Sequence, residues 1–133
     1  MTLEHVAIWT SRLEELKEFY VQFFDGTCSA KYVNPSTNFE SYFISFENGA
    51  RLELMKKPKV PKNLNNPSDQ YLGIIHIAFD AGSMAEVDRR CEKMREAGFK
   101  ILRGPRKTGD GYYEFETLDP DNNRLEVCSR WSE

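Results

Sequence analysis

The chain has 133 residues, enough for one domain with a buried core and too few for two domains of ordinary size. Its net charge of −3 provides no basic field for nucleic acid or an acidic membrane, so neither partner is expected. Apolar residues make up 40 %, and no run of them approaches the roughly 20 needed to cross a bilayer. With no signal-peptide pattern and three cysteines that form no CxxC pair, we expect a cytoplasmic protein without a disulfide framework.

The chain opens with a strand-like segment at residues 4–10 and continues as a helix. Ser11 and Glu14 have the spacing of a capping box, in which the serine oxygen accepts from a backbone N–H and the glutamate reaches back. One face of the helix is apolar and is formed by Leu13, Leu16, Phe19, Tyr20 and Phe23. Gly26 is expected to end the helix, because glycine adopts the left-handed conformation without a Cβ clash.

The first half then closes with two predicted strands, at residues 41–47 and 51–55. Asn48 and Gly49 lie between them and predict a hairpin turn. Residues 56–69 are rich in Lys, Pro and Asn, which predicts a linker.

The same order of signals returns in the second half. A strand-like segment at residues 73–80 precedes a helix that Ser83 and Glu86 begin with the second capping-box spacing. Gly98 is expected to end this helix. Its apolar face is formed by Met84, Val87, Cys91 and Met94. The two helices have the same expected length, because each glycine follows its serine by 15 residues.

Further strands follow at residues 112–118 and 124–128, and residues 119–122 predict the turn that joins them. Residues 103–109 contain three basic side chains and two glycines, and we expect them to form a flexible loop between strands.

The repeated order indicates a duplicated unit of βαβββ type in an α+β fold. The sequences RLEL at residues 51–54 and RLEV at residues 124–127 occupy matching places in the two halves. We therefore predict a single domain over residues 1–133, made of module 1–57 and module 70–133 joined by the linker.

Two histidines and two glutamates stand out by their register. Strand side chains alternate between the two faces of a sheet, so His5 and Glu53 are expected on the face opposite the helix, as are His76 and Glu126. His76 follows His5 by 71 residues and Glu126 follows Glu53 by 73, so the pairs are equivalent. A lone histidine or glutamate on a strand is usually structural or solvated, but repeated pairs on one face favour a metal site.

Imidazole and carboxylate ligands suit Zn, Ni, Co, Mn or Fe(II). A divalent cation also offsets the repulsion between two carboxylates in a partly buried cleft. We predict one divalent metal per site, Zn, Ni or Co rather than Fe or Mn, with the ligands His5, Glu53, His76 and Glu126.

These segments resemble the vicinal-oxygen-chelate (VOC) superfamily, and within it glyoxalase I, a lactoylglutathione lyase, and its bacterial relatives. The resemblance rests on HVAIWTSRLEELKEFYVQFFDG at 5–26, RLELM at 51–55, GIIHIAFD at 73–80 and ETLDPDNNRLEV at 116–127. It implies that the two βαβββ modules form an incomplete, curved β-barrel around the metal. It also implies a homodimer, with the metal site either within one chain or across two.

By this resemblance the chain is a metalloenzyme, a lyase or isomerase that acts on an α-oxo-aldehyde thiol adduct or a similar small molecule with vicinal oxygens. Glu126 would abstract a proton as the base, Glu53 would be the second carboxylate, and the metal would stabilise the enediolate. Epimerase, extradiol dioxygenase, thiol transferase and drug-binding resistance protein remain alternatives. Related dioxygenases and fosfomycin-resistance transferases typically use two His and one Glu, so the fourth ligand favours the isomerases and epimerases.

Three further residues are candidates for substrate binding. Trp9 stands where glutathione-using relatives commonly carry an arginine, so glutathione as the thiol is open, and Trp9 either lines an apolar pocket or packs structurally. Arg103 and Arg106 in the basic segment are candidates for holding an anionic substrate tail, since arginine makes bidentate contacts to carboxylates and phosphates. The alternative is an ordinary solvated loop.

Overall fold

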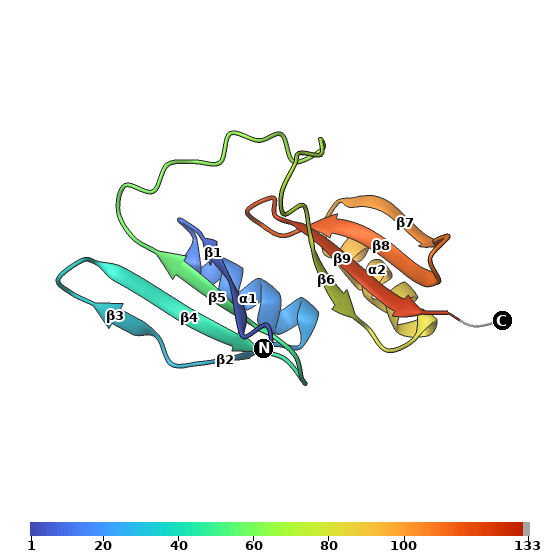
Figure 1. The fold of residues 1–133 in the computed structure, drawn as a ribbon, viewed down its shortest axis with the longest axis horizontal. Coiled ribbons are helices and arrows are strands. Elements are labelled where there is room, and N and C mark those ends of the chain that lie inside the picture. The colour runs from blue at the N-terminus through green and yellow to red at the C-terminus, as the bar shows by residue number, and fades with distance from the viewer. Residues whose placement is uncertain (132–133) are drawn as a thin grey trace. The chain divides into compact units, whose positions relative to one another are not determined.

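The computed structural model describes residues 1–131 and divides into two compact units, Met1–Leu64 and Asn65–Glu133. The division falls inside the Lys, Pro and Asn-rich segment, where residues 57–76 form neither helix nor strand. Each unit contains one open sheet with one helix against it (Figure 1). Among the described residues, no helix is both long and apolar enough to cross a membrane.

The first unit has five strands and one helix. Its sheet runs in the order β1-β5-β4-β2, with β3 also pairing with β4, and β1 lies parallel to β5. The elements are β1 (His5–Trp9), α1 (Leu13–Phe24), β2 (Thr27–Cys28), β3 (Tyr32–Asn34), β4 (Phe39–Ser45) and β5 (Arg51–Lys56).

The second unit repeats this plan with four strands. Its sheet runs β6-β9-β8-β7, and the first strand is again parallel to the last. The elements are β6 (Ile77–Asp80), α2 (Met84–Glu96), β7 (Ile101–Lys107), β8 (Tyr112–Leu118) and β9 (Arg124–Arg130). The prediction of an α+β fold with repeated modules and open sheets is confirmed. The second unit has the predicted βαβββ order, and the first has one additional short strand, β3.

Each helix covers one face of its sheet with the apolar stripe that the sequence predicts. All five predicted residues of α1 are buried, and Phe24 joins them. Below them lie Ile44, Leu52 and Leu54, each exposed by 3 % or less. In the second unit Val87, Cys91 and Met94 are the buried residues of α2. Burial of each such large side chain contributes roughly 1.5–3 kcal/mol to the stability of the fold. Because each helix covers only one face of its sheet, the opposite face can carry a functional site.

The first capping box was predicted wrongly. Arg12 is the N-cap of α1, and no side chain caps the helix there. Glu14 instead accepts a hydrogen bond from the Tyr42 hydroxyl at 3.0 Å and pairs with Lys31 at 3.0 Å. Contacts with residues distant in sequence therefore replace the local contact that the motif predicts.

Gly26 is also not the left-handed residue at the end of α1. Asp25 takes that conformation, with φ of 55°. Gly26 is needed for a different reason, because a Cβ added to it would collide with the side chain of buried Ile44.

The second helix follows its predicted signals more closely. The Ser83 hydroxyl accepts from the Glu86 N–H at 3.2 Å, as predicted. The Glu86 carboxylate does not reach back but pairs with Arg89 and Arg90. Gly98 has φ of 89° just beyond the helix, as expected of its end.

Two further predictions need correction. β6 begins at Ile77 rather than at residue 73, so His76 immediately precedes the strand. The predicted loop at residues 103–109 is largely strand β7, which pairs with β8 through two register shifts. Gly104 permits this pairing, because its φ is 86° and a Cβ there would strike the backbone of Glu114.

Candidate metal centre

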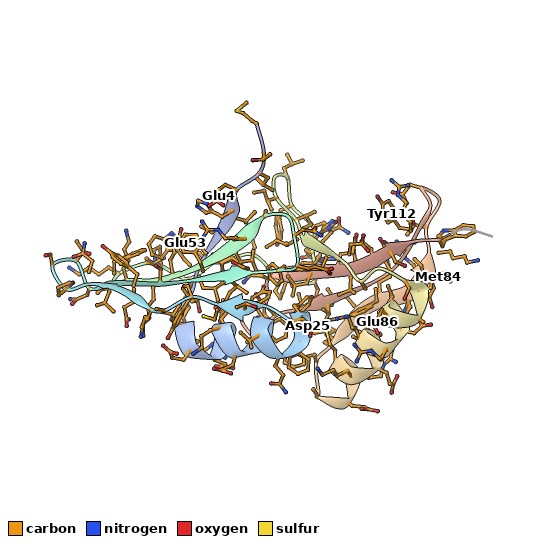
Figure 2. The ribbon with its side chains drawn as sticks, turned by 90° about the horizontal axis from the view of Figure 1, so that it is seen from below. Glu4, Asp25, Glu53, Met84, Glu86 and Tyr112 are labelled. Atoms are coloured by element: carbon orange, nitrogen blue, oxygen red, sulfur yellow. The ribbon has the colours of Figure 1, made fainter. Side chains whose placement is uncertain are left out.

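In the first unit, the parallel pairing of β1 with β5 brings His5 and Glu53 together. The register places Ala7 beside Glu53, so the two side chains occupy diagonal positions on one face. That face is turned away from α1, because the flanking Leu52 and Leu54 are buried under the helix (Figure 2). His5 Nε2 lies 3.8 Å from Glu53 Oε1.

The other ring nitrogen of His5 has a carboxylate neighbour. His5 Nδ1 is 3.3 Å from Glu4 Oε1, and Glu4 also pairs with Arg51. The edge of the imidazole packs against Phe43, with ring centroids 5.5 Å apart. A carboxylate at Nδ1 orients a histidine ring and leaves Nε2 for a ligand, which is the arrangement that metal-binding histidines use.

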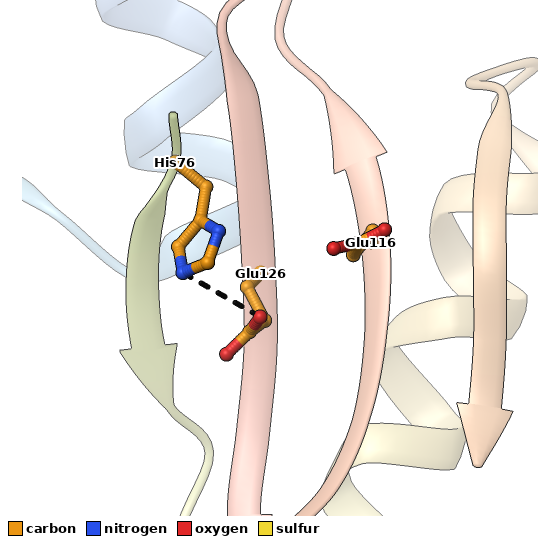
Figure 3. Close-up of side chains that lie close together, drawn as sticks. All are labelled: His76, Glu116 and Glu126. Carbon is orange, nitrogen blue, oxygen red and sulfur yellow. Dashed lines mark ion pairs between the residues drawn. The ribbon is translucent and has the colours of Figure 1, made fainter. Parts of the chain in front are cut away.

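The second unit repeats the pair with nearly the same geometry. His76 Nε2 lies 3.6 Å from Glu126 Oε2, the contact drawn as a dashed line in Figure 3. Ala78 is beside Glu126 in the register, as Ala7 is beside Glu53. Both glutamates are largely buried, with side-chain exposures of 17 % for Glu53 and 14 % for Glu126.

Glu116 joins this second pair, and the sequence interpretation missed it. It lies on β8 directly opposite Glu126, and ligand atoms of His76, Glu116 and Glu126 all fall within 4.8 Å of one another (Figure 3). The same position in the first unit, opposite Glu53, is Phe43. The alternation along β8 indicates its position, because the neighbours Phe115 and Thr117 are buried on the helix side and Glu116 therefore points to the opposite face. Glu116 has no counterpart in the first unit, so the repeat does not reveal it.

Glu114, two residues before Glu116 on β8, is a further acidic residue of this face and is only 8 % exposed. Burial, followed by the charge of Glu126, raises the pKa of Glu114. Burial is also the main cause that raises the pKa of Glu126. The charges of the two glutamates therefore influence each other within this buried face.

Comparison with known proteins identifies the family. The model of the Glyoxalase/Bleomycin resistance protein/Dioxygenase superfamily matches residues 2–127. The chain belongs to this superfamily. Among curated proteins it is similar to the uncharacterized protein YqjT of Bacillus subtilis (strain 168), with 27 % identity over 130 residues that cover 96 % of this chain and 98 % of YqjT.

Solved structures agree on the fold. A glyoxylase/bleomycin resistance protein/dioxygenase domain from Frankia sp. EAN1pec matches with a TM-score of 0.81 and 18 % identity, covering 98 % of each chain. The trypanothione-dependent glyoxalase I of Leishmania major matches with a TM-score of 0.75 and 19 % identity, covering 97 % of this chain and 86 % of that one. The predicted resemblance to the superfamily is confirmed, and at these identities the structures show the fold alone.

The donor set of this glyoxalase-superfamily chain fits a divalent cation. Two ligands about 2.1 Å from one ion stand roughly 3.0–3.6 Å apart at angles of 90–120°. The histidine–glutamate distances of 3.6 and 3.8 Å are close to that range and too long for hydrogen bonds. Neither pair is therefore joined by a direct hydrogen bond, and a cation could be held by the nitrogen and the oxygen.

The second unit also contains an open cavity of about 420 Å³ beside its pair. It is lined by His76, Ala78, Arg106, Thr108, Asp110, Tyr112, Glu114, Glu126 and Cys128. Arg106, predicted to contact the substrate, is among these residues and lies 3.4 Å from Glu114. Arg103, predicted for the same role, is exposed on β7 and is not in the lining.

Trp9 lies at the end of β1 in the first unit, on the same face as His5. It is 40 % exposed and packs edge-on against Phe39, with centroids 6.1 Å apart. Lys57 lies over its ring at 4.8 Å. Trp9 is thus a partly open aromatic surface on the face that carries His5 and Glu53.

Proposed function

We propose that this superfamily member is a metal-dependent enzyme of the glyoxalase I type. It would act on an α-oxo-aldehyde thiol adduct or a similar small molecule with two neighbouring oxygens, and would move a proton between adjacent carbons. The observation that carries the proposal is the repeated histidine–glutamate pair, 3.8 Å apart in one unit and 3.6 Å in the other. The four ligands proposed for one divalent cation are His5, Glu53, His76 and Glu126.

When bound, such a cation would act as a Lewis acid on the two substrate oxygens. The chain's own task is then the proton transfer. Glu126 is the proposed base by the resemblance to glyoxalase I, and burial raises its pKa in the metal-free chain. Glu126 would then return the proton to the neighbouring carbon. Glu53 is the second carboxylate.

The thiol is proposed to differ from glutathione. Trp9 occupies the place where glutathione-using relatives commonly have an arginine, and its ring is partly open on the face of His5. Trp9→Arg should then raise the rate with the glutathione adduct relative to adducts of uncharged thiols. We also propose that the protein is cytoplasmic, in keeping with three cysteines that are all free. A homodimer is proposed from the resemblance to the superfamily.

The deciding experiment combines metal analysis of the purified protein with a panel of thiol adducts in deuterated solvent. An isomerase should incorporate solvent deuterium at the substrate carbon only when metal is present, and should consume no oxygen. Oxygen uptake with a catechol would identify a dioxygenase instead. Ligand binding without turnover and without any need for metal would identify a binding protein and refute the proposal.

A further inference from the structure

The cavity of the second unit extends across the whole sheet, from the His76 side to the opposite edge. His76 precedes β6 at one edge, and Arg106 lies on β7 at the other. Strands β9 and β7 are separated only by β8, so their backbones are about 10 Å apart. A small molecule held at His76 and Glu126 would therefore reach Arg106 with its other end.

We propose that Arg106 binds a carboxylate of the substrate, so that the substrate carries an anionic group a few bonds from its two neighbouring oxygens. This inference rests on the proposed function, since it concerns the same site. It assigns anion recognition to Arg106 and withdraws it from Arg103, whose side chain lies outside the cavity.

Arg106 has donors to spare. A guanidinium has five N–H donors, and the recorded contact is Nη2 to Glu114 Oε1 at the long distance of 3.4 Å. The Arg106 side chain is 40 % exposed, so guanidinium N–H groups that Glu114 does not use can donate to a ligand oxygen in the cavity.

Each acidic residue of the lining already has a polar neighbour in the chain, which leaves Arg106 as the group that can attract an anion. Glu126 faces His76, Glu114 contacts Arg106, and Asp110 accepts from the Thr108 hydroxyl. Apart from His76, Arg106 is the one basic residue among those that line the cavity. A singly charged carboxylate suits a lining that also contains carboxylates better than a phosphate, which carries more charge.

The test uses two matched probes, 2-oxoglutarate and 2-oxopentanoate. Both offer a keto and a carboxylate oxygen to a divalent cation, and they differ only in the second carboxylate of 2-oxoglutarate. Calorimetric titration of the metal-loaded protein should show 2-oxoglutarate binding roughly ten- to hundredfold more tightly, as a charge-assisted bidentate contact provides. Arg106→Met should reduce this preference to about onefold, with the 2-oxopentanoate affinity little changed.

Lys100→Met is the matched control, because it removes one positive charge from an exposed residue next to β7 and should keep the preference. Arg106→Lys keeps the positive charge but cannot make the bidentate guanidinium contact, so an intermediate preference for 2-oxoglutarate is expected. This variant tests the inference even if Arg106→Met folds poorly. Equal binding of the probes to the wild type, or an unchanged preference in both Arg106 variants, overturns the inference alone. A protein that takes up no metal overturns the proposed function and this inference with it.

Discussion

Glu116 lies directly across the sheet from Glu126, while the equivalent place beside Glu53 in the first unit is occupied by an aromatic ring. The two histidine–glutamate pairs are thus repeated, but their surroundings are not. The second unit carries the additional acidic side chain of Glu116 beside its pair. Arg124 balances the negative charge of Glu116, since its Nη1 lies 3.6 Å from that carboxylate. This asymmetry makes the contributions of the two units separable by mutation.

The histidines are expected to hold the metal. His5→Ala and His76→Ala should each reduce bound metal severely, because each removes a nitrogen ligand, whereas Glu92→Ala on the exposed face of α2 should not. Elemental analysis of the purified variants measures this. The wild type should bind one metal per chain. A stoichiometry of two would mean that each pair binds a cation independently.

Arg124→Met should destabilise the metal-free protein by about 2 kcal/mol, since Glu116 would remain 12 % exposed beside Glu126 without its partner. A bound cation offsets the same repulsion, so the metal-dependent gain in stability should be larger in the variant than in the wild type. Urea denaturation with and without metal measures both quantities.

Arg51→Met is the matched control for Arg124→Met. Arg51 occupies the equivalent position in the first unit, but it pairs with exposed Glu4 and contacts Phe43 where the second unit has an acid. We expect a much smaller loss of stability, because exposed ion pairs contribute little, and no altered response to metal. Equal responses from both variants would contradict the asymmetry.

Glu126→Gln should lower turnover by roughly 10²–10⁴-fold, the usual effect of losing a general base. The amide keeps an oxygen that binds metal but accepts no proton, so metal content should fall far less than the rate. Glu53→Gln is the comparison, because it alters the matching ligand without removing the proposed base. Steady-state kinetics at measured metal content would decide, and a wild-type rate in Glu126→Gln excludes its role as the base.

Glu114 should make the metal-free protein less stable as the pH rises above 4.5. Burial raises the folded-state pKa of Glu114 above the usual 4.5, so its neutral form stabilises the fold fully below that pH. This contribution disappears as the pH rises through the raised pKa. Glu114→Gln cannot ionise and should flatten the profile, measured by urea denaturation between pH 4.5 and about pH 7.5.

Glu14→Gln should change the dependence of stability on pH in the opposite direction. A hydrogen bond from Lys31 is the main cause that lowers the pKa of Glu14, so its contribution is present above pH 4.5 and disappears as the pH falls. A profile that Glu114→Gln leaves unchanged would show that Glu114 ionises freely in the fold.

Gly26→Ala should destabilise the protein by about 1–3 kcal/mol, the usual cost of overpacking. The added methyl group would collide with Ile44, which is fully buried. Gly109→Ala is the control, since a Cβ there meets nothing within 4 Å. Thermal denaturation of both variants tests the difference, and equal melting temperatures would show that the sheet yields to the methyl group without cost.

Much of the fold was predictable because the two halves repeat their signals. The helix stripes and the strand alternation that places His5 beside Glu53 depend on local periodicity, which a sequence shows directly. Strand β7 was missed because its register shifts and central Gly104 interrupt that periodicity, and only pairing with β8 makes it a strand. Glu116 was missed for a related reason, since its importance comes from a neighbouring strand.

The parallel pairing of first and last strands has a consequence for how the protein is made. Glu53 follows His5 by 48 residues, and Glu126 follows His76 by 50, so each pair joins the opening of its unit to its final strand. A chain emerging from the ribosome therefore holds each histidine long before the glutamate that completes the pair. A cation held by such a pair would close a long loop and oppose fraying of both ends together. Metal capture would then be the last step of maturation, and only chains with β9 in place would complete it.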